Sequence, residues 1–258
     1  MAKIFCVANQ KGGVGKTTTT VNLAAGLAKI GQRVLMVDLD PQGNATMGSN
    51  LDKRALAHTV YDVLWGEASL SEARQKAVDC GYDVLGANRE LAGAEVELVS
   101  LENRERRLKD AIASVDHEYD FVLIDCPPSL GLLTLNAFVA ADAVLVPLQC
   151  EFYALEGLSM LLRTVERVRK AFNPGLDIQG VVLTMFDVRN NLSEQVAADV
   201  REHLGEKVYR TVIPRNVRVS EAPSHGLPVL VYDMRCAGSK AYIHLASEVI
   251  KRERGLAA

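Results

Sequence analysis

The chain lacks paired cysteines and long apolar runs. None of its five cysteines forms a C-x-x-C pair, and Cys6 and Cys126 stand beside apolar, strand-like segments, so buried free thiols are expected. The richest apolar segment, 130–148, is interrupted by Asn136 and Asp142. No uninterrupted apolar run is therefore long enough to span a bilayer, and stable membrane association is not expected.

A strong excess of charge is also missing. The net charge is −3 and the pI is near 6.0, which excludes a protein that is basic overall and restricts any nucleic-acid site to a local patch. The first residues enter a strand-like segment without the charged leader of a signal peptide, so a cytoplasmic location is expected. The 258 residues, 48% hydrophobic and without internal repeats, predict a single domain over 1–258.

A glycine-rich loop, 9–18, follows the apolar run 4–8 and opens a helix-like segment, 19–30. Strand, glycine loop and helix together predict a phosphate site, because backbone N–H groups curl around phosphate oxygens and the helix N-terminus adds partial positive charge. In this arrangement Lys16 reaches the β- and γ-phosphates, and Thr17 offers its hydroxyl to Mg²⁺.

The loop departs from the ordinary P-loop at two positions. Gln10 stands where glycine is usual, and Lys11 adds a second lysine, which is the signature of the deviant Walker A motif K-G-G-x-G-K-[ST]. A glycine-rich turn that only joins strand to helix would leave Lys16 and Thr17 unexplained. The residues expected to bind nucleotide here are Lys11, Gly12, Gly13, Val14, Gly15, Lys16, Thr17 and Thr18.

Two carboxylates, Asp38 and Asp40, stand at the carboxyl end of the buried-strand pattern 33–38, in the sequence Asp-Leu-Asp-Pro. Ligands bind at the carboxyl ends of strands in open α/β sheets. Asp40 is therefore predicted to orient the attacking water and Asp38 to help hold Mg²⁺. An ordinary turn is the alternative for D-x-D-P, and the neighbouring phosphate loop favours the catalytic interpretation.

A second buried strand, 119–125, ends in Asp125 and resembles a Walker B strand. Asp125 is predicted to meet Mg²⁺ directly or through water, and the following Pro-Pro segment to respond to the γ-phosphate. Cys126 is the alternative functional residue, as a nucleophile. It lacks an identifiable histidine partner, because His117 lies on the far side of the strand.

Strands alternate with helices along the rest of the chain, which predicts an α/β fold with a doubly wound, mostly parallel sheet and helices on both faces. The segment 51–81 is only weakly helical. Further strands are expected at 82–85, 143–147, 180–185 and 208–213, and helices at 91–115, 153–172, 193–204 (capped by Ser193) and 238–252.

The chain closely resembles the ParA/Soj chromosome and plasmid partition ATPases over essentially its whole length. The resemblance implies an ATP-dependent, Mg²⁺-dependent sandwich dimer in which Lys11 reaches the phosphates of the partner. It implies that Asp40 is the catalytic aspartate and that adenine lies near Pro214 and Asn216. The segments that carry it are 11–18, 38–46, 125–131, 150–158 and 213–223.

The resemblance also implies binding of nonspecific DNA by the ATP-bound homodimer, through Arg189 and Arg218, and nucleoid association. It implies a ParB/Spo0J-type centromere-binding partner that stimulates hydrolysis. Without the resemblance, Arg189 is interpreted as an exposed loop residue and Arg218 as part of a surface ion pair. Dimerisation would bring the Arg189 and Arg218 side chains of two copies onto one face of an acidic protein.

Three other kinds of ATPase share features with this sequence. A MinD-like positioning ATPase should end in a basic amphipathic helix with bulky apolar residues, whereas the residues after Ile250 are few and poor in apolar bulk. The nitrogenase iron protein and iron–sulfur scaffold proteins need paired cysteines. A small-molecule enzyme such as dethiobiotin synthetase would show ATPase activity that depends on its substrate and not on DNA.

Overall fold

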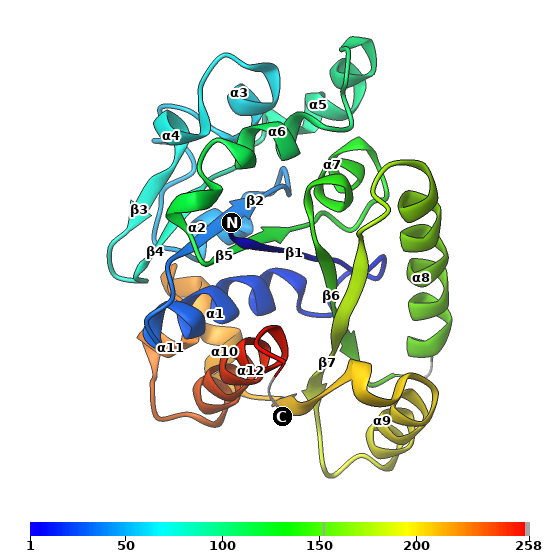
Figure 1. The fold of residues 1–258 in the computed structure, drawn as a ribbon. Coiled ribbons are helices and arrows are strands. Elements are labelled where there is room, and N and C mark those ends of the chain that lie inside the picture. The colour runs from blue at the N-terminus through cyan, green and yellow to red at the C-terminus, as the bar shows by residue number, and fades with distance from the viewer. Residues whose placement is uncertain (152, 256–258) are drawn as a thin grey trace.

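A twisted eight-stranded sheet runs through the molecule in the computed structural model, which describes residues 1–151 and 153–255 (Figure 1). The strand order is β3-β4-β2-β5-β1-β6-β7-β8, and all pairs are parallel except β3 with β4 at one edge. The strands are β1 (Lys3–Val7), β2 (Val34–Asp38), β3 (Gln75–Ala77), β4 (Tyr82–Leu85), β5 (Phe121–Asp125), β6 (Ala143–Gln149), β7 (Asp177–Phe186) and β8 (Val208–Pro214).

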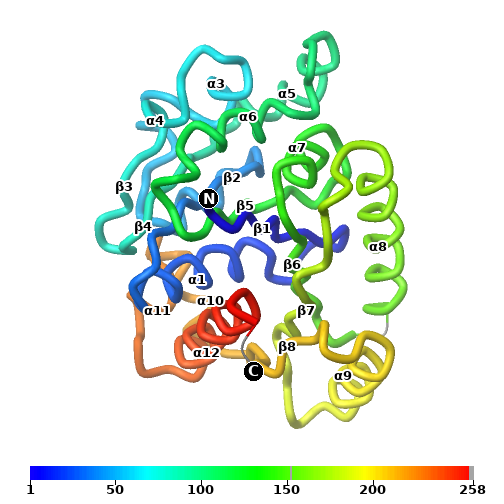
Figure 2. The backbone as a smooth tube through the Cα atoms, in the orientation of Figure 1, coloured from blue at the N-terminus to red at the C-terminus, as the bar shows by residue number. Residues whose placement is uncertain are grey.

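Helices cover both faces of this sheet, with α1, α11 and α12 on one side and α7 and α8 on the other (Figure 2). No helix in the described residues is long and apolar enough to cross a membrane. The α-helices are α1 (Lys16–Lys29), α2 (Asn44–Met47), α3 (Val60–Trp65), α4 (Leu70–Ala73), α5 (Leu91–Glu97), α6 (Arg107–Ala113), α7 (Leu132–Ala140), α8 (Ala154–Ala171), α9 (Asn191–Leu204), α10 (Val217–Glu221), α11 (Val229–Tyr232) and α12 (Ala237–Glu253), and the 3₁₀ turns are η1 (Leu98–Ser100), η2 (Asp116–Glu118), η3 (Gly205–Lys207) and η4 (Ala222–His225).

The central strands are buried on both faces, as their near-continuous apolar sequences predict. In β2, Leu35 and Val37 belong to the core cluster that includes residues of α3, α6, α7 and α8, while Val34 and Met36 belong to the cluster that includes residues of α1 and α12. Because the central strands are parallel, their carboxyl ends and the loops that follow them lie at one edge of the sheet. The predicted doubly wound, mostly parallel α/β fold is confirmed.

Several local predictions were wrong. Helix α1 begins at Lys16 and not at residue 19, and the segment 91–115 is divided into α5, η1 and α6. Ser193 does not cap α9: it is buried inside the helix, and Asn190 is the cap, because its Oδ1 accepts a hydrogen bond of 3.0 Å from the Leu192 N–H. Helix α7 was missed because nearly all of its residues are buried, so it has no apolar periodicity.

Candidate functional site

The loop between β1 and α1 has a backbone that requires glycine. Gly13 has φ +75° and Gly15 has φ +88°, which is the left-handed region that glycine enters without steric cost. Helix α1 begins at Lys16, directly after Gly15, and no side chain caps it. Its first backbone N–H groups are therefore available to an anion.

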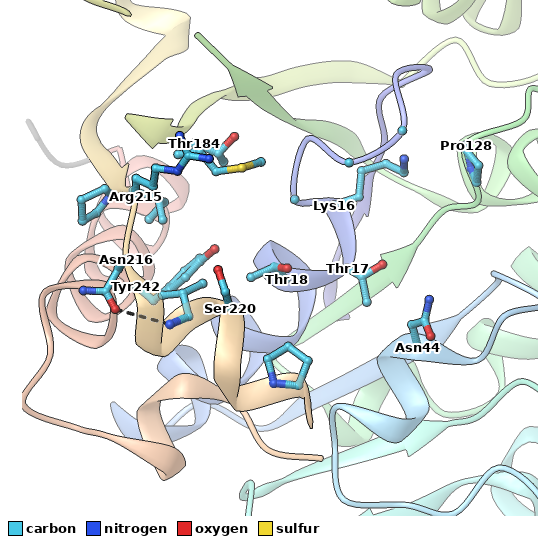
Figure 3. Close-up of a pocket in the computed structure, with 18 of the residues that line it drawn as sticks. Lys16, Thr17, Thr18, Asn44, Pro128, Thr184, Arg215, Asn216, Ser220 and Tyr242 are labelled. Atoms are coloured by element: carbon cyan, nitrogen blue, oxygen red, sulfur yellow. Dashed lines mark hydrogen bonds between the residues drawn. The ribbon is translucent and has the colours of Figure 1, made fainter. Parts of the chain in front are cut away.

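A cavity of about 480 Å³ opens beside this loop (Figure 3). A Cβ atom added to Gly12 or Gly13 would meet no protein atom within 4 Å, so the space next to these glycines is open to a ligand. The lining residues are Gly12, Gly13, Gly15, Lys16, Thr17, Thr18, Asp40, Asn44, Pro128, Thr184, Met185, Ile213, Pro214, Arg215, Asn216, Val219, Ser220, Pro223 and Tyr242.

The two loop lysines differ in environment. Lys16 lines the cavity, is only 8% exposed and points its Nζ at the Lys11 carbonyl oxygen, 3.4 Å away. Burial lowers the pKa of Lys16, and the charge of Asp125 opposes that effect. Among the described residues, Lys11 is outside the cavity lining; its half-exposed ammonium forms an ion pair with Glu151 of the same chain.

Asp125, at the end of β5, lies behind the phosphate loop. It is completely buried and accepts hydrogen bonds from the Thr17 and Thr20 hydroxyls, at 2.7 and 3.0 Å. Burial and the charge of Asp38 raise the pKa of Asp125. Thr20 was missed by the sequence analysis, although its position one turn after Thr17 on the same helix was a usable signal. A hydroxyl in the cavity with a carboxylate directly behind it fits the Mg²⁺ site of a P-loop.

Asp38, at the end of β2, is engaged entirely by protein donors. Its Oδ1 accepts from the Asp40 N–H at 3.0 Å, and its Oδ2 accepts from the Thr46 N–H and hydroxyl, both at 2.8 Å. Burial raises the pKa of Asp38. The carboxylate thus fixes the loop that carries Asp40, whereas its contact with Mg²⁺ stays a prediction. Thr46 also accepts from the Ala87 N–H, which ties this loop to the chain after β4.

Asp40 reaches the cavity from that fixed loop. Its Oδ1 accepts a hydrogen bond of 2.9 Å from the Gln42 N–H. In the described part of the chain, no donor contacts its second carboxylate oxygen, Oδ2. One oxygen is therefore anchored and the other is available to a ligand or water, which is the arrangement that orientation of a nucleophile requires.

The opposite end of the cavity is formed by β7, β8, α10 and α12 (Figure 3). The predicted adenine residues lie there: Pro214 ends β8, and Asn216 is the N-cap of α10. The Asn216 Oδ1 caps α10 by accepting from the N–H groups of Arg218 and Val219, at 3.0 and 3.4 Å. Only the Asn216 amide NH₂ is left for a ligand. Tyr242, from α12, was not predicted, since nothing in its local sequence indicates a site.

The two arginines predicted to contact DNA lie outside the cavity lining. Arg189 follows β7 and is paired with Asp187 at 2.8 Å; this pair holds the pKa of Asp187 well below its usual range. Arg218, in α10, is paired with Glu221 at 2.9 Å and with Asp233 at 3.6 Å. Arg189 follows the carboxyl end of β7, and Arg218 follows the carboxyl end of β8. Because these two strands are parallel neighbours, both arginines lie at the carboxyl ends of the strands, on the same side of the molecule.

The cysteines take no visible part in the site. Cys6, Cys80, Cys126 and Cys150 are buried free thiols, as predicted, and Cys236 is half-buried. Contact with Cys6 and burial raise the pKa of Cys126 well above its usual value, which disfavours the thiolate form that a nucleophile needs.

Three features of the site suit a phosphate group: open space beside the glycines, a helix N-terminus and a buried lysine. Together they define the class of protein as a P-loop nucleotide hydrolase. A family model described as "AAA domain" matches residues 2–178. The chromosome partitioning protein ParA of Caulobacter vibrioides is 59% identical over 254 residues, covering 98% of this chain and 95% of that protein. The sporulation initiation inhibitor protein Soj of Bacillus subtilis is 55% identical, covering 96% and 98%.

A solved structure, cobyrinic acid a,c-diamide synthase from Mycobacterium smegmatis with bound ADP and magnesium, is 40% identical with a TM-score of 0.87 and covers 98% of this chain and 96% of that one. The chain belongs to the AAA domain family and, within it, to the ParA/Soj chromosome-partitioning ATPases. The predicted family and ATPase activity are thereby confirmed.

Proposed function

We propose that this ATPase segregates DNA as a nucleotide-dependent dimer. Its ATP-bound dimer binds nonspecific DNA on the nucleoid, and hydrolysis, stimulated by a ParB/Spo0J-type partner, releases it. The observation that carries the proposal is the contrast between the two loop lysines: Lys16 faces its own cavity, whereas Lys11 faces outward beside Glu151. An outward lysine in a phosphate loop is placed to serve the phosphates of a second copy.

ATP and Mg²⁺ are the cofactors, in agreement with the ADP and magnesium of the related synthase structure. Mg²⁺ neutralises charge on the β- and γ-phosphates. The Thr17 hydroxyl is the protein oxygen placed to hold it, with Asp125 behind that hydroxyl, and Lys16 binds the phosphates. Asp40 orients the attacking water through its available carboxylate oxygen, and Lys11 of the partner copy stabilises the developing charge.

The positions of Arg189 and Arg218 support the proposed DNA binding. The Arg215 N–H donates to the Phe186 carbonyl at 2.9 Å, which joins the end of β7, shortly before Arg189, to the segment between β8 and α10, shortly before Arg218. Their ion pairs are exposed and therefore contribute little free energy, so DNA phosphates can compete with Asp187 and Glu221 for them. Two copies would double this patch on one face of a protein with net charge −3.

The test is fluorescence anisotropy of a random-sequence duplex at one stated salt concentration, with protein in Mg-ATP, in Mg-ADP and as Arg189→Glu in Mg-ATP. Binding is expected only in Mg-ATP and only with Arg189 intact. Arg163→Glu, an equal charge change on the exposed face of α8, is the matched control and should bind normally. Equal binding by Arg189→Glu would contradict the proposed surface.

A small-molecule ATP-dependent enzyme is the second candidate, favoured by the likeness to the synthase structure. The higher identity to the partition proteins favours DNA segregation instead. Steady-state ATP hydrolysis separates the two functions. A segregation ATPase should respond to DNA together with a ParB-type protein, whereas an enzyme of the second kind would turn over only with its small-molecule substrate.

A further inference from the structure

One residue of the cavity wall has a backbone conformation that its side chain does not favour. Three non-glycine residues in the described chain have positive φ: Asn50, Asn103 and Met185, the last at φ +50°. Asparagine tolerates this region because its short polar side chain bonds locally, whereas a long aliphatic side chain there is an outlier. Met185 therefore needs another reason for its conformation.

The structure holds Met185 from both sides. The hydroxyl of Thr184, the preceding residue, donates to the Val14 carbonyl in the phosphate loop at 2.8 Å. The carbonyl of Phe186, the following residue, accepts from the Arg215 N–H at 2.9 Å, and the register between β7 and β8 shifts at this point. Met185 lies in β7 between these two anchors, and its left-handed backbone lets it line the cavity.

Different residues line the two ends of the cavity. Lys16 and Thr17 lie at one end, and Thr184, Asn216 and Tyr242 lie at the other (Figure 3). A nucleotide whose phosphates occupy the glycine loop therefore directs its base toward β7 and β8. Besides Met185, the apolar side chains in the cavity lining are Pro128, Ile213, Pro214, Val219 and Pro223.

We propose that Met185 is a base-contact residue of the nucleotide site, whose thioether packs on the purine ring. The inference rests on the proposed nucleotide site and deepens it. Methionine suits this role because its unbranched, polarisable side chain adapts to an aromatic surface. Met185 is half-buried without nucleotide, so the base would cover apolar surface that is otherwise in contact with water. The strained backbone of Met185 at the end of β7 aims this side chain at the base.

The test is isothermal titration calorimetry with two probes, Mg-ADP and Mg-pyrophosphate, because pyrophosphate occupies the phosphate end and lacks a base. Met185→Ala and Met185→Gly should each weaken ADP binding about tenfold, consistent with the loss of one buried apolar side chain, and leave pyrophosphate binding unchanged. Met185→Leu should stay within about threefold of the original chain. Met160→Ala, on the exposed side of α8, is the control.

The two smaller variants also separate the side chain from the backbone. Glycine removes the left-handed strain and alanine keeps it, so Met185→Gly should unfold at a higher temperature than Met185→Ala without nucleotide. Unchanged ADP affinity in Met185→Ala, or an equal loss for ADP and pyrophosphate, would overturn the base contact. Failure of the original chain to bind either probe would overturn the nucleotide site itself, and this inference with it.

Discussion

The two ends of the cavity are built in different ways. At the phosphate end, one continuous loop and the helix after it supply the residues placed to bind phosphate, and Asp125 supports them from β5 through the Thr17–Asp125 hydrogen bond of 2.7 Å. The base end collects single residues from β7, β8 and α12, such as Met185, Pro214 and Tyr242. Phosphate binding is thus encoded locally, whereas base binding depends on how the sheet is assembled.

The first prediction concerns the phosphate end and has the largest effect. Lys16→Ala removes a buried cation whose hydrogen bonds to phosphate are charge-assisted, so nucleotide affinity should fall about 100-fold or more. Nucleotide-dependent dimerisation, measured by light scattering, should be lost with it. Lys29→Ala, an exposed lysine in the last turn of α1, is the control and should behave normally. Unchanged dimerisation in Lys16→Ala would count against the phosphate site.

The second prediction separates binding from turnover at the same end. Asp40→Ala should preserve ATP binding and dimerisation and lower the hydrolysis rate about 100-fold, because the attacking water loses its orienting acceptor. Phosphate release at saturating ATP measures the rate, and calorimetry measures the binding. Hydrolysis at the original rate would remove Asp40 from its catalytic role.

The difference between the two ends explains which residues of the site could be predicted from the sequence and which could not. The loop 9–18, Asp40 and Asp125 could be proposed as site residues from the sequence because each stands at the carboxyl end of a recognisable strand, and parallel strands bring these ends together. Met185 was not found, because its role comes from a register shift between β7 and β8 that no local pattern encodes. Asn190 was missed as the α9 cap because Ser193 satisfied the same local rule.

The third prediction concerns the buried support of the phosphate end. Thr46→Val removes the hydroxyl that donates to Asp38 and accepts from the Ala87 N–H, which leaves two buried polar groups short of a partner. The free energy of unfolding should fall by about 2 kcal/mol. Thr46→Ser keeps the hydroxyl and should recover most of that loss in urea denaturation. An unchanged free energy of unfolding in Thr46→Val would contradict the role of these hydrogen bonds, and equal destabilisation by both variants would show that the methyl group contributes as much as they do.

The fourth prediction has the smallest effect and concerns the base end, where one side chain serves both fold and ligand. Asn216→Ala removes the α10 cap and the amide NH₂, and should lower the free energy of unfolding by about 1 kcal/mol and weaken ADP binding a few-fold. Asn216→Asp keeps the capping oxygen and loses the NH₂.

This second variant should therefore retain the unfolding free energy of the original chain in urea denaturation and lose ADP affinity as the alanine variant does. Full ADP affinity in Asn216→Asp would mean that Asn216 acts only through the helix. The base end would then be recognised by apolar contact alone, and the contrast with the charged phosphate end would become sharper.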